Sequence, residues 1–136
     1  VGEGERRGGA VVLHATFELR TDDPRAIFAR LETSLKKRNA TQPVTERSVG
    51  CVFQNPACGA AAKLIDDAGC KSMRVGDISV SVKHANYFVN DGTGSSAEFV
   101  RLIRAVAGRV ADSSGVGLEL EIKTWDVRGL DEFMVP

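Results

Sequence analysis

Net charge and cysteine are scarce in this sequence, and a long apolar run is missing altogether. The 136-residue chain has 18 basic and 18 acidic residues, and this balance predicts neither a nucleic-acid partner nor a membrane-surface partner. No run approaches the ~20 apolar residues of a membrane-spanning helix, and no basic-then-apolar signal peptide stands at the start. We therefore expect a cytoplasmic protein that binds neither membrane nor nucleic acid.

The cysteines are too few and too irregularly spaced for a disulfide framework or a metal site. Cys51, Cys58 and Cys70 are odd in number, and neither a Cys-x-x-Cys pair nor a histidine pair accompanies them. We expect free thiols in a reducing compartment and no bound metal. The glycines also form no phosphate-cradling loop after a strand, so no self-contained nucleotide-cofactor fold is predicted.

What is present fits one ordinary domain. The content of 43% hydrophobic and 26% charged residues is globular, and 136 residues suffice to bury a single core. The chain starts at Val1 rather than methionine, and a glycine-rich charged lead follows over residues 2–9. We expect this lead to fray, and the start suggests a piece of a longer protein.

The N-terminal third predicts a strand followed by a helix. Residues 10–19 are rich in β-branched and aromatic side chains, which favours a strand. Asp22 and Asp23 then precede a proline, and this is a helix start; Ile27, Leu31 and Leu35 share one face of a helix that ends near residue 39. Residues 40–48 lack periodicity and are predicted to be a connector.

The middle of the chain predicts short elements. Residues 59–68 are expected to form a helix that ends at Gly69, and residues 74–82 alternate as a strand with Gly76 as a possible bulge. The apolar run 87–89 is closed by the turn residues 90–92.

The C-terminal part predicts the most regular helix and a closing strand. Ser95 and Glu98 have the spacing of a capping box, and an i, i+3, i+4, i+7 pattern of apolar residues follows from Phe99 to Val110. Residues 115–125 alternate, so they are expected to form a strand with Glu119, Glu121 and Lys123 facing solvent. The order of elements predicts an α+β fold.

Residues 50–56, Gly-Cys-Val-Phe-Gln-Asn-Pro, are the stretch where chemistry is most concentrated. A thiol follows a flexible glycine, and Asn55 precedes a proline, which turns its backbone out of regular structure. Cys51 and Asn55 could therefore face one pocket. On residue type alone, Cys51 is open to three interpretations: a nucleophile, a proton donor or a buried core residue.

A second polar group follows the predicted strand 74–82. Lys83, His84 and Asn86 lie between two apolar runs, where they could contact a ligand or only complete a satisfied turn. Cys51 and His84 could form a pair like that of the cysteine proteases, but no third residue that would orient the histidine is identifiable.

Several stretches together resemble one enzyme family, UDP-N-acetylmuramate dehydrogenase, also called UDP-N-acetylenolpyruvoylglucosamine reductase. The resemblance covers the C-terminal part of that family over residues 41–122, and residues 17–38 fit the strand and helix that precede it. The matching stretches are 41–43 with 50–56, 63–65 with 68–69, 74–76 through 81–90, and 118–122.

The resemblance implies a flavoenzyme of peptidoglycan precursor synthesis. In the family, hydride passes from NADPH to FAD and then to the enolpyruvyl group of a UDP-sugar, and a protein acid supplies the proton. Cys51 stands where the family has that proton donor, usually a serine, and Glu121 matches a glutamate that stabilises the enolic intermediate. A thiol with an ordinary pKa near ~8.5 is mostly protonated at neutral pH and able to donate.

The resemblance also implies substrate contacts. Asn55, Lys71 and His84 match positions that contact the UDP-sugar, with His84 where relatives also show glutamine. Lys83 and Asn86 flank the same loop and are further candidates. Ala62 before Lys63 and Leu120 before Glu121 depart mildly from the family pattern, as do Cys70 and Ser72 beside Lys71.

The largest departure is the absence of the N-terminal half, which binds FAD and supplies a catalytic arginine in the family. We therefore expect a small substrate-binding α/β domain at residues 49–118. A strand-helix remnant of the flavin-binding domain would precede it over 1–48, and a closing strand would return to that domain over 119–136. No cofactor is expected in this chain alone, which should be inactive without its missing half. The alternatives are a non-catalytic module that binds a nucleotide-sugar or a partner, and a cysteine-nucleophile enzyme.

Overall fold

An antiparallel sheet and one long helix form the centre of the structure, a computed structural model that describes residues 12–123. The sheet has the strand order β1-β4-β3-β2, with every neighbouring pair antiparallel. This mixture confirms the predicted α+β class. The elements, in chain order, are α1 (Pro24–Thr41), β1 (Ser48–Cys51), α2 (Ala61–Asp67), β2 (Arg74–Val75), β3 (Ile78–Val80), β4 (Tyr87–Asn90) and α3 (Ser96–Ser114).

Helix α3 forms where its sequence signals predicted. The Ser95 hydroxyl accepts from the Glu98 amide at 3.3 Å, and the Glu98 carboxylate accepts from the Ser95 amide at 2.7 Å, so the capping box is complete. The helix ends at Gly115, whose φ of 71° is the left-handed cap conformation that glycine favours. Its apolar face is fully buried at the predicted positions Leu102, Ile103, Val106 and Val110.

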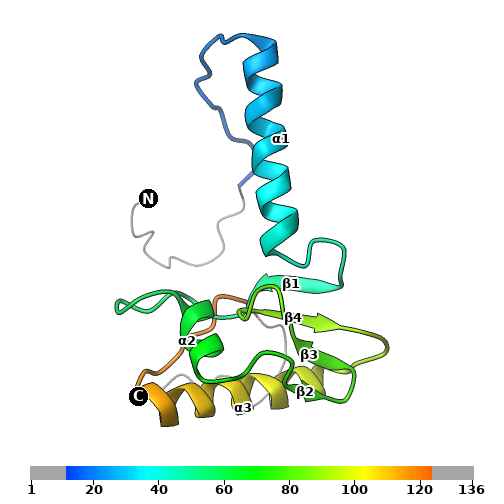
Figure 1. Ribbon diagram of the computed structural model, residues 1–136, viewed down its shortest axis with the longest axis vertical. Coiled ribbons are helices and arrows are strands. Elements are labelled where there is room, and N and C mark those ends of the chain that lie inside the picture. Colours follow the sequence, from blue (N-terminus) through cyan, green and yellow to red (C-terminus); the bar gives the residue numbers. More distant parts are fainter. Residues whose placement is uncertain (1–11, 124–136) are drawn as a thin grey trace.

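The core joins α3 to the sheet through aromatic contacts. Phe88 of β4 packs edge-on against Phe53, with ring centroids 6.1 Å apart, and against Phe99 of α3 at 5.8 Å. Burying side chains of this size contributes about 1.5–3 kcal/mol each. Helix α3 also packs against β2, β3 and α2, which places it along one side of the sheet (Figure 1).

The predicted strand 74–82 is wrong in detail, because the structure has a hairpin there. Strands β2 and β3 pair with Val75 opposite Ile78, so Gly76 and Asp77 form a two-residue turn. Gly76 has a φ of 59°, which a first central turn residue needs and which glycine adopts without strain. It is therefore a turn residue and not the expected bulge.

The predicted strand 10–19 is also wrong for the residues that the structure describes. Residues 12–19 have no regular structure, and Val12, Leu13 and Phe17 are 84%, 87% and 78% exposed. A strand needs a partner for its backbone groups, and the described part of the chain provides none here. Residues 10 and 11 lie outside the described residues.

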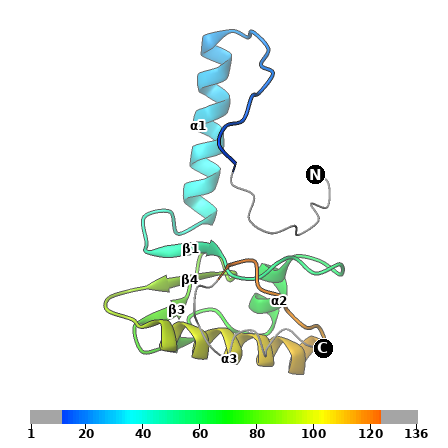
Figure 2. The same ribbon diagram turned by 180° about the vertical axis from the view of Figure 1, so that it is seen from behind.

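Helix α1 is confirmed, but its apolar face is not covered. The Asp23 carboxylate accepts from the Ala26 amide at 3.2 Å, which is the predicted cap, and the helix ends at Thr41, two residues later than expected. Every residue of α1 is described and none is buried; Ile27, Leu31 and Leu35 are 45%, 52% and 48% exposed. Figures 1 and 2 show α1 projecting away from the sheet and α3.

The closing segment keeps its predicted alternation but contributes only one bridge. Leu118 and Leu120 are buried while Glu119, Glu121 and Lys123 are exposed, as expected. Backbone pairing is limited to an antiparallel bridge between Phe53 and Leu120. Residues 124 and 125 of the predicted strand lie outside the described residues. The predicted helix 59–68 is confirmed as α2, with Gly69 in the left-handed conformation at its end.

Candidate functional site

Cys51 lies at the end of β1, directly opposite Tyr87 of β4. Directly opposed residues of an antiparallel pair project from the same face of the sheet, so the thiol and the phenol are neighbours. Gly50, with a φ of 85°, precedes the cysteine, and the strand register is irregular between Ser48 and Cys51. The Cys51 side chain is half-buried.

The surroundings of Cys51 favour its protonated form. Burial raises the pKa of the thiol, the neighbouring Tyr87 hydroxyl partly lowers it, and the charge of Glu121 raises it further. The net direction is upward, so at neutral pH the sulfur carries its proton. This arrangement suits a proton donor, whereas a nucleophile needs a thiolate that is abundant at neutral pH.

The backbone after Cys51 is held from one side by Asn86. The Val52 amide donates to the Asn86 carbonyl at 2.9 Å and the Phe53 amide donates to the Asn86 side-chain oxygen at 2.9 Å. The Asn86 side-chain amide in turn donates to the Phe53 carbonyl at 2.7 Å. Asn86 is 1% exposed, and both ends of its side chain are engaged by Phe53.

The same backbone is held from the other side by the closing segment. The Glu121 amide donates to the Val52 carbonyl at 2.9 Å, and the Gln54 amide donates to the Glu119 carbonyl at 2.8 Å. These bonds bring Glu121 close enough for its charge to act on the Cys51 thiol. The structure therefore brings together the two residues that the sequence analysis named as catalytic.

Asn55 has a defined position at the start of α2. Its side-chain oxygen accepts from the Ala61 amide at 3.0 Å, which satisfies a donor that the helix itself leaves free. Ala60, the residue at the N-cap, supplies no side-chain hydrogen bond. Asn55 thus caps the helix from outside it, and Asn55 is exposed.

His84 lies beside Tyr87 and is half-buried. Its ring meets the Tyr87 ring edge-on, with centroids 4.7 Å apart, and its Nδ1 atom is buried without a hydrogen-bond partner among the described residues. Burial lowers the pKa of His84, its own backbone partly raises it, and the charge of Lys71 lowers it further; the net direction is downward, so the imidazole is neutral at neutral pH. Lys71 pairs with Asp66 at 2.6 Å, and Lys83 is exposed.

Tyr87 is the neighbour of Cys51 that the sequence analysis missed. The sequence places it in an apolar run, although a phenol hydroxyl near a core normally needs a polar partner, and that need is the available signal. Its pairing with Cys51 depends on strand register, which the sequence does not show.

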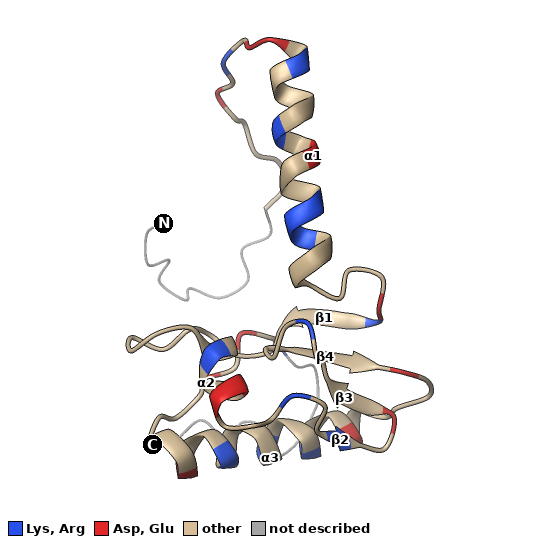
Figure 3. Ribbon diagram, in the orientation of Figure 1, with Lys and Arg blue, Asp and Glu red and all other residues tan. Residues whose placement is uncertain are grey.

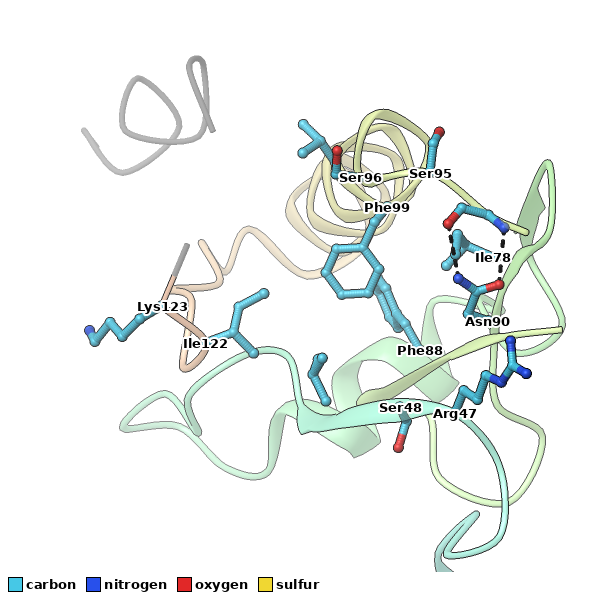
Figure 4. A pocket seen from close by; sticks show the side chains of 13 residues that line it. Arg47, Ser48, Ile78, Phe88, Asn90, Ser95, Ser96, Phe99, Ile122 and Lys123 are labelled. Carbon is cyan, nitrogen blue, oxygen red and sulfur yellow. Dashed lines mark hydrogen bonds between the residues drawn. The ribbon is translucent and has the colours of Figure 1, made fainter. Parts of the chain in front are cut away.

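A separate cavity of about 690 Å³ lies between the sheet and the start of α3 (Figure 4). Its floor is apolar, with Phe88, Phe99 and Ile122, and Arg47 and Lys123 also line it. Its lining includes Ser48 and Val49 of β1 but not Cys51 or Asn55. The cavity and the Cys51 cluster are therefore neighbours along β1 rather than one site.

Charges of both signs are mixed along the elements (Figure 3). Several are paired on the surface, including Lys63 with Asp67 at 2.7 Å and Arg74 with Asp91. Among residues 12–123 no group of three or more potential ligands is placed to hold a metal ion. No helix within that range is long and apolar enough to cross a membrane.

Comparison with known proteins identifies consistent relatives. The profile of a family described as UDP-N-acetylenolpyruvoylglucosamine reductase, C-terminal domain, matches residues 42–125. The UDP-N-acetylenolpyruvoylglucosamine reductase of Novosphingobium aromaticivorans is 42% identical over 115 residues, which are 85% of this chain and 39% of that protein. The enzyme of the same name from Magnetococcus marinus is 42% identical over 122 residues, or 90% of this chain and 39% of that protein.

A solved structure agrees with these relatives. The crystal structure of UDP-N-acetylenolpyruvylglucosamine reductase from Thermus caldophilus has a TM-score of 0.65 and 35% sequence identity, and the match covers 79% of this chain and 38% of that one. The chain thus spans about two-fifths of the length of the relatives that it matches.

Proposed function

The chain belongs to the UDP-N-acetylenolpyruvoylglucosamine reductase family, whose C-terminal domain it contains, and on that premise we propose that it is the substrate-binding part of such a reductase. The proposed reaction reduces UDP-N-acetylglucosamine enolpyruvate to UDP-N-acetylmuramate for peptidoglycan synthesis, with NADPH as reductant and FAD as the hydride carrier. The three free thiols are compatible with a cytoplasmic location. The observation that carries the proposal is the placement of Cys51 beside Glu121.

Cys51 is proposed as the proton donor. FAD, once reduced by NADPH and held by the other half of such a reductase, would supply hydride to the enolpyruvyl group, and the carbanion-like carbon of the substrate would then need a proton. The Cys51 S–H bond breaks, the proton forms the new C–H bond, and the electron pair stays on sulfur. A thiol whose pKa is raised by burial and by Glu121 keeps that proton available until the carbon requires it.

Glu121 is proposed to stabilise the enolic intermediate. Its backbone is fixed to Val52 at 2.9 Å while its side chain is exposed, so the carboxyl group is free to meet a substrate. Hydrogen bonds that match charge only as it develops lower the barrier most. No residue of this chain is assigned to holding FAD.

Asn55, Lys71, His84 and Lys83 are proposed to contact the UDP-sugar. Lys71 is compatible with a role at the diphosphate, because an ammonium group recognises phosphate as a point charge. For Asn86, we propose a supporting role in place of the direct contact, since both ends of its side-chain amide are bonded to Phe53. A contact between Asn86 and substrate remains an untested prediction.

The missing half of the reductase is the proposed partner of α1. The half-exposed Ile27, Leu31 and Leu35, and the exposed Phe28 beside them, form an apolar helix face that nothing in the described chain covers. Uncovered apolar faces of this kind mark interaction surfaces. We also propose a division into residues 1–48, 49–118 and 119–136, with the outer two belonging to the flavin-binding domain.

A second candidate is a non-catalytic module that binds a nucleotide-sugar. The observation in its favour is that the core lies within residues 52–120 and draws on no residue of α1, so the substrate-binding part has a core of its own. A module of this kind would bind the UDP-sugar with no dependence on Cys51. A reductase would lose turnover, but not binding, on Cys51→Ala.

Calorimetric titration of this chain with UDP-N-acetylglucosamine enolpyruvate tests the substrate assignment. We expect binding that weakens about ten-fold or more in Lys71→Ala, because a charge-assisted contact contributes about 1.5–3 kcal/mol. Lys63→Ala is the matched control, since Lys63 also pairs with an aspartate of α2 but is not assigned to substrate. Equal affinities of the two variants, or no binding by the unmodified chain, would contradict the proposal.

A further inference from the structure

Tyr87 is the only tyrosine of the chain, and the proposed function leaves it without a role. It begins β4, directly across from Cys51 at the end of β1. Its backbone is fixed at both groups: the Tyr87 amide donates to the His84 carbonyl at 2.9 Å, and the Ser81 amide donates to the Tyr87 carbonyl at 2.9 Å. The phenol therefore projects from a rigid position beside the thiol.

The ring of Tyr87 is also held by its neighbour on the loop. The edge-on contact with His84, at a centroid distance of 4.7 Å and an interplanar angle of 69°, supports one side of the ring. Edge-on aromatic contacts stabilise a structure by more than the burial of their apolar surface alone. Because its ring is supported in this way, the Tyr87 side chain loses little conformational entropy when its hydroxyl forms a hydrogen bond.

We propose that Tyr87 is a positioning residue for Cys51, with its hydroxyl donating a hydrogen bond to the sulfur. The bond would fix the direction of the S–H group and stabilise the thiolate that remains after the proton has left. No atom of Tyr87 is transferred: the thiol proton goes to carbon, the electron pair stays on sulfur, and the phenol keeps its own hydrogen. The role of Tyr87 in proton transfer rests on the proposed function, whereas the contact between Tyr87 and Cys51 does not.

The charges around the pair agree with this direction of donation. Burial and the neighbouring Cys51 raise the pKa of Tyr87, and Arg38 at the end of α1 lowers it in part, so the phenol stays protonated and able to donate at neutral pH. The same bond lowers the pKa of Cys51 against the opposing effects of burial and Glu121. A hydrogen bond donated to the sulfur stabilises the thiolate and therefore lowers the pKa of the thiol.

The first test measures the pH dependence of Cys51 alkylation by iodoacetamide, read at the level of single peptides. In Tyr87→Phe the thiol should ionise at higher pH, so that below the midpoint its thiolate fraction falls about three- to ten-fold. Exposed Cys58 in the same molecule is the internal reference, and its profile should stay the same. An unchanged midpoint for Cys51 in a folded Tyr87→Phe protein would overturn the proposal.

The second test works in the opposite direction and needs no change at Tyr87. Because the chain has a single tyrosine, ultraviolet absorbance reports the ionisation of Tyr87 alone. Cys51→Ala should let Tyr87 ionise at lower pH, while Cys58→Ala, the matched control, should leave it unchanged. A tyrosine midpoint that is the same in all three proteins would refute the contact even if Tyr87→Phe failed to fold.

Neither test uses a substrate, so the two proposals fail separately. A thiol midpoint that shifts in a chain that does not bind the UDP-sugar would support the contact and contradict only the proposed function. Tight binding of the UDP-sugar with unchanged midpoints would contradict only the role of Tyr87.

Discussion

Replacing Asn86 with alanine should destabilise the protein more than any other single amide replacement near the site. Asn86 occupies a buried position in which its side chain imitates a strand, with one bond from the Phe53 amide and one to the Phe53 carbonyl. The bridge between Phe53 and Leu120 does not use these two groups, because its bonds run through Val52, Gln54, Glu119 and Glu121. Alanine would leave both Phe53 groups without their partner.

The expected cost follows from those two groups. A buried donor or acceptor that loses its partner costs about 1–3 kcal/mol, so two of them predict a loss of about 2–6 kcal/mol in the free energy of unfolding. Small domains have about 5–15 kcal/mol in total, so the loss is a large share. Asn55 is also a single bridging amide, but it is exposed and bonds only the Ala61 amide, which predicts about 1 kcal/mol or less.

Urea unfolding followed by circular dichroism measures both variants under the same conditions. The free energy of unfolding of Asn86→Ala should lie well below that of Asn55→Ala. The value for Asn55→Ala should in turn lie slightly below that of the unmodified chain. A loss for Asn86→Ala no larger than that for Asn55→Ala would refute the assignment of Asn86 as the support of the Cys51 segment.

Three further predictions concern charge and backbone conformation. Glu121→Gln should lower the pKa of Cys51, because the carboxylate raises it. Alkylation of this thiol at neutral pH should then become about two- to three-fold faster. An unchanged rate would show that the charge of Glu121 does not act on Cys51. The pKa of His84 is lowered in the folded state, so the folded state binds fewer protons and stability should fall as pH drops below about 6.5, the unfolded value. His84→Gln should flatten that part of the stability profile in urea unfolding at several pH values, and an identical slope in both proteins would contradict it. Gly76→Ala should lower the free energy of unfolding by about 1–3 kcal/mol, because φ is 59° and a Cβ would clash with the Glu98 carboxylate that caps α3. Gly108→Ala in α3, where a Cβ would meet nothing within 4 Å, should instead raise it by about 0.5–1 kcal/mol, and thermal unfolding would show both changes.

Elements with local signals were predictable, and elements that depend on a distant partner were not. Helix α3 carries its cap, its apolar face and its terminal glycine within residues 95–115, so each signal agrees with the next. Residues 12–19 have the composition of a strand, but composition cannot supply the neighbouring strand. The β2–β3 hairpin was missed although its Gly-Asp turn is a known hairpin signal, because alternation across residues 74–82 resembled one strand.

The candidate site follows the same distinction. The resemblance of residues 50–56 to a family motif located Cys51 and Asn55, and the structure then placed Glu121 near the thiol through backbone pairing with Val52. Tyr87 could not be assigned to Cys51 from sequence, since their pairing depends on the register of strands 36 positions apart in the chain. Residue type alone also left open whether Asn86 faces a ligand or the core.

The activity of a chimera would show whether this chain supplies the substrate-binding part and the proton donor of a reductase. Residues 42–123 of this chain would replace the matching region of the Novosphingobium aromaticivorans relative, and NADPH oxidation would be followed with UDP-N-acetylglucosamine enolpyruvate. Turnover should fall about 10²-fold or more in Cys51→Ala, while binding of the UDP-sugar remains. A folded, flavin-loaded chimera that does not bind the UDP-sugar, or one that turns over equally well without the thiol, would contradict it.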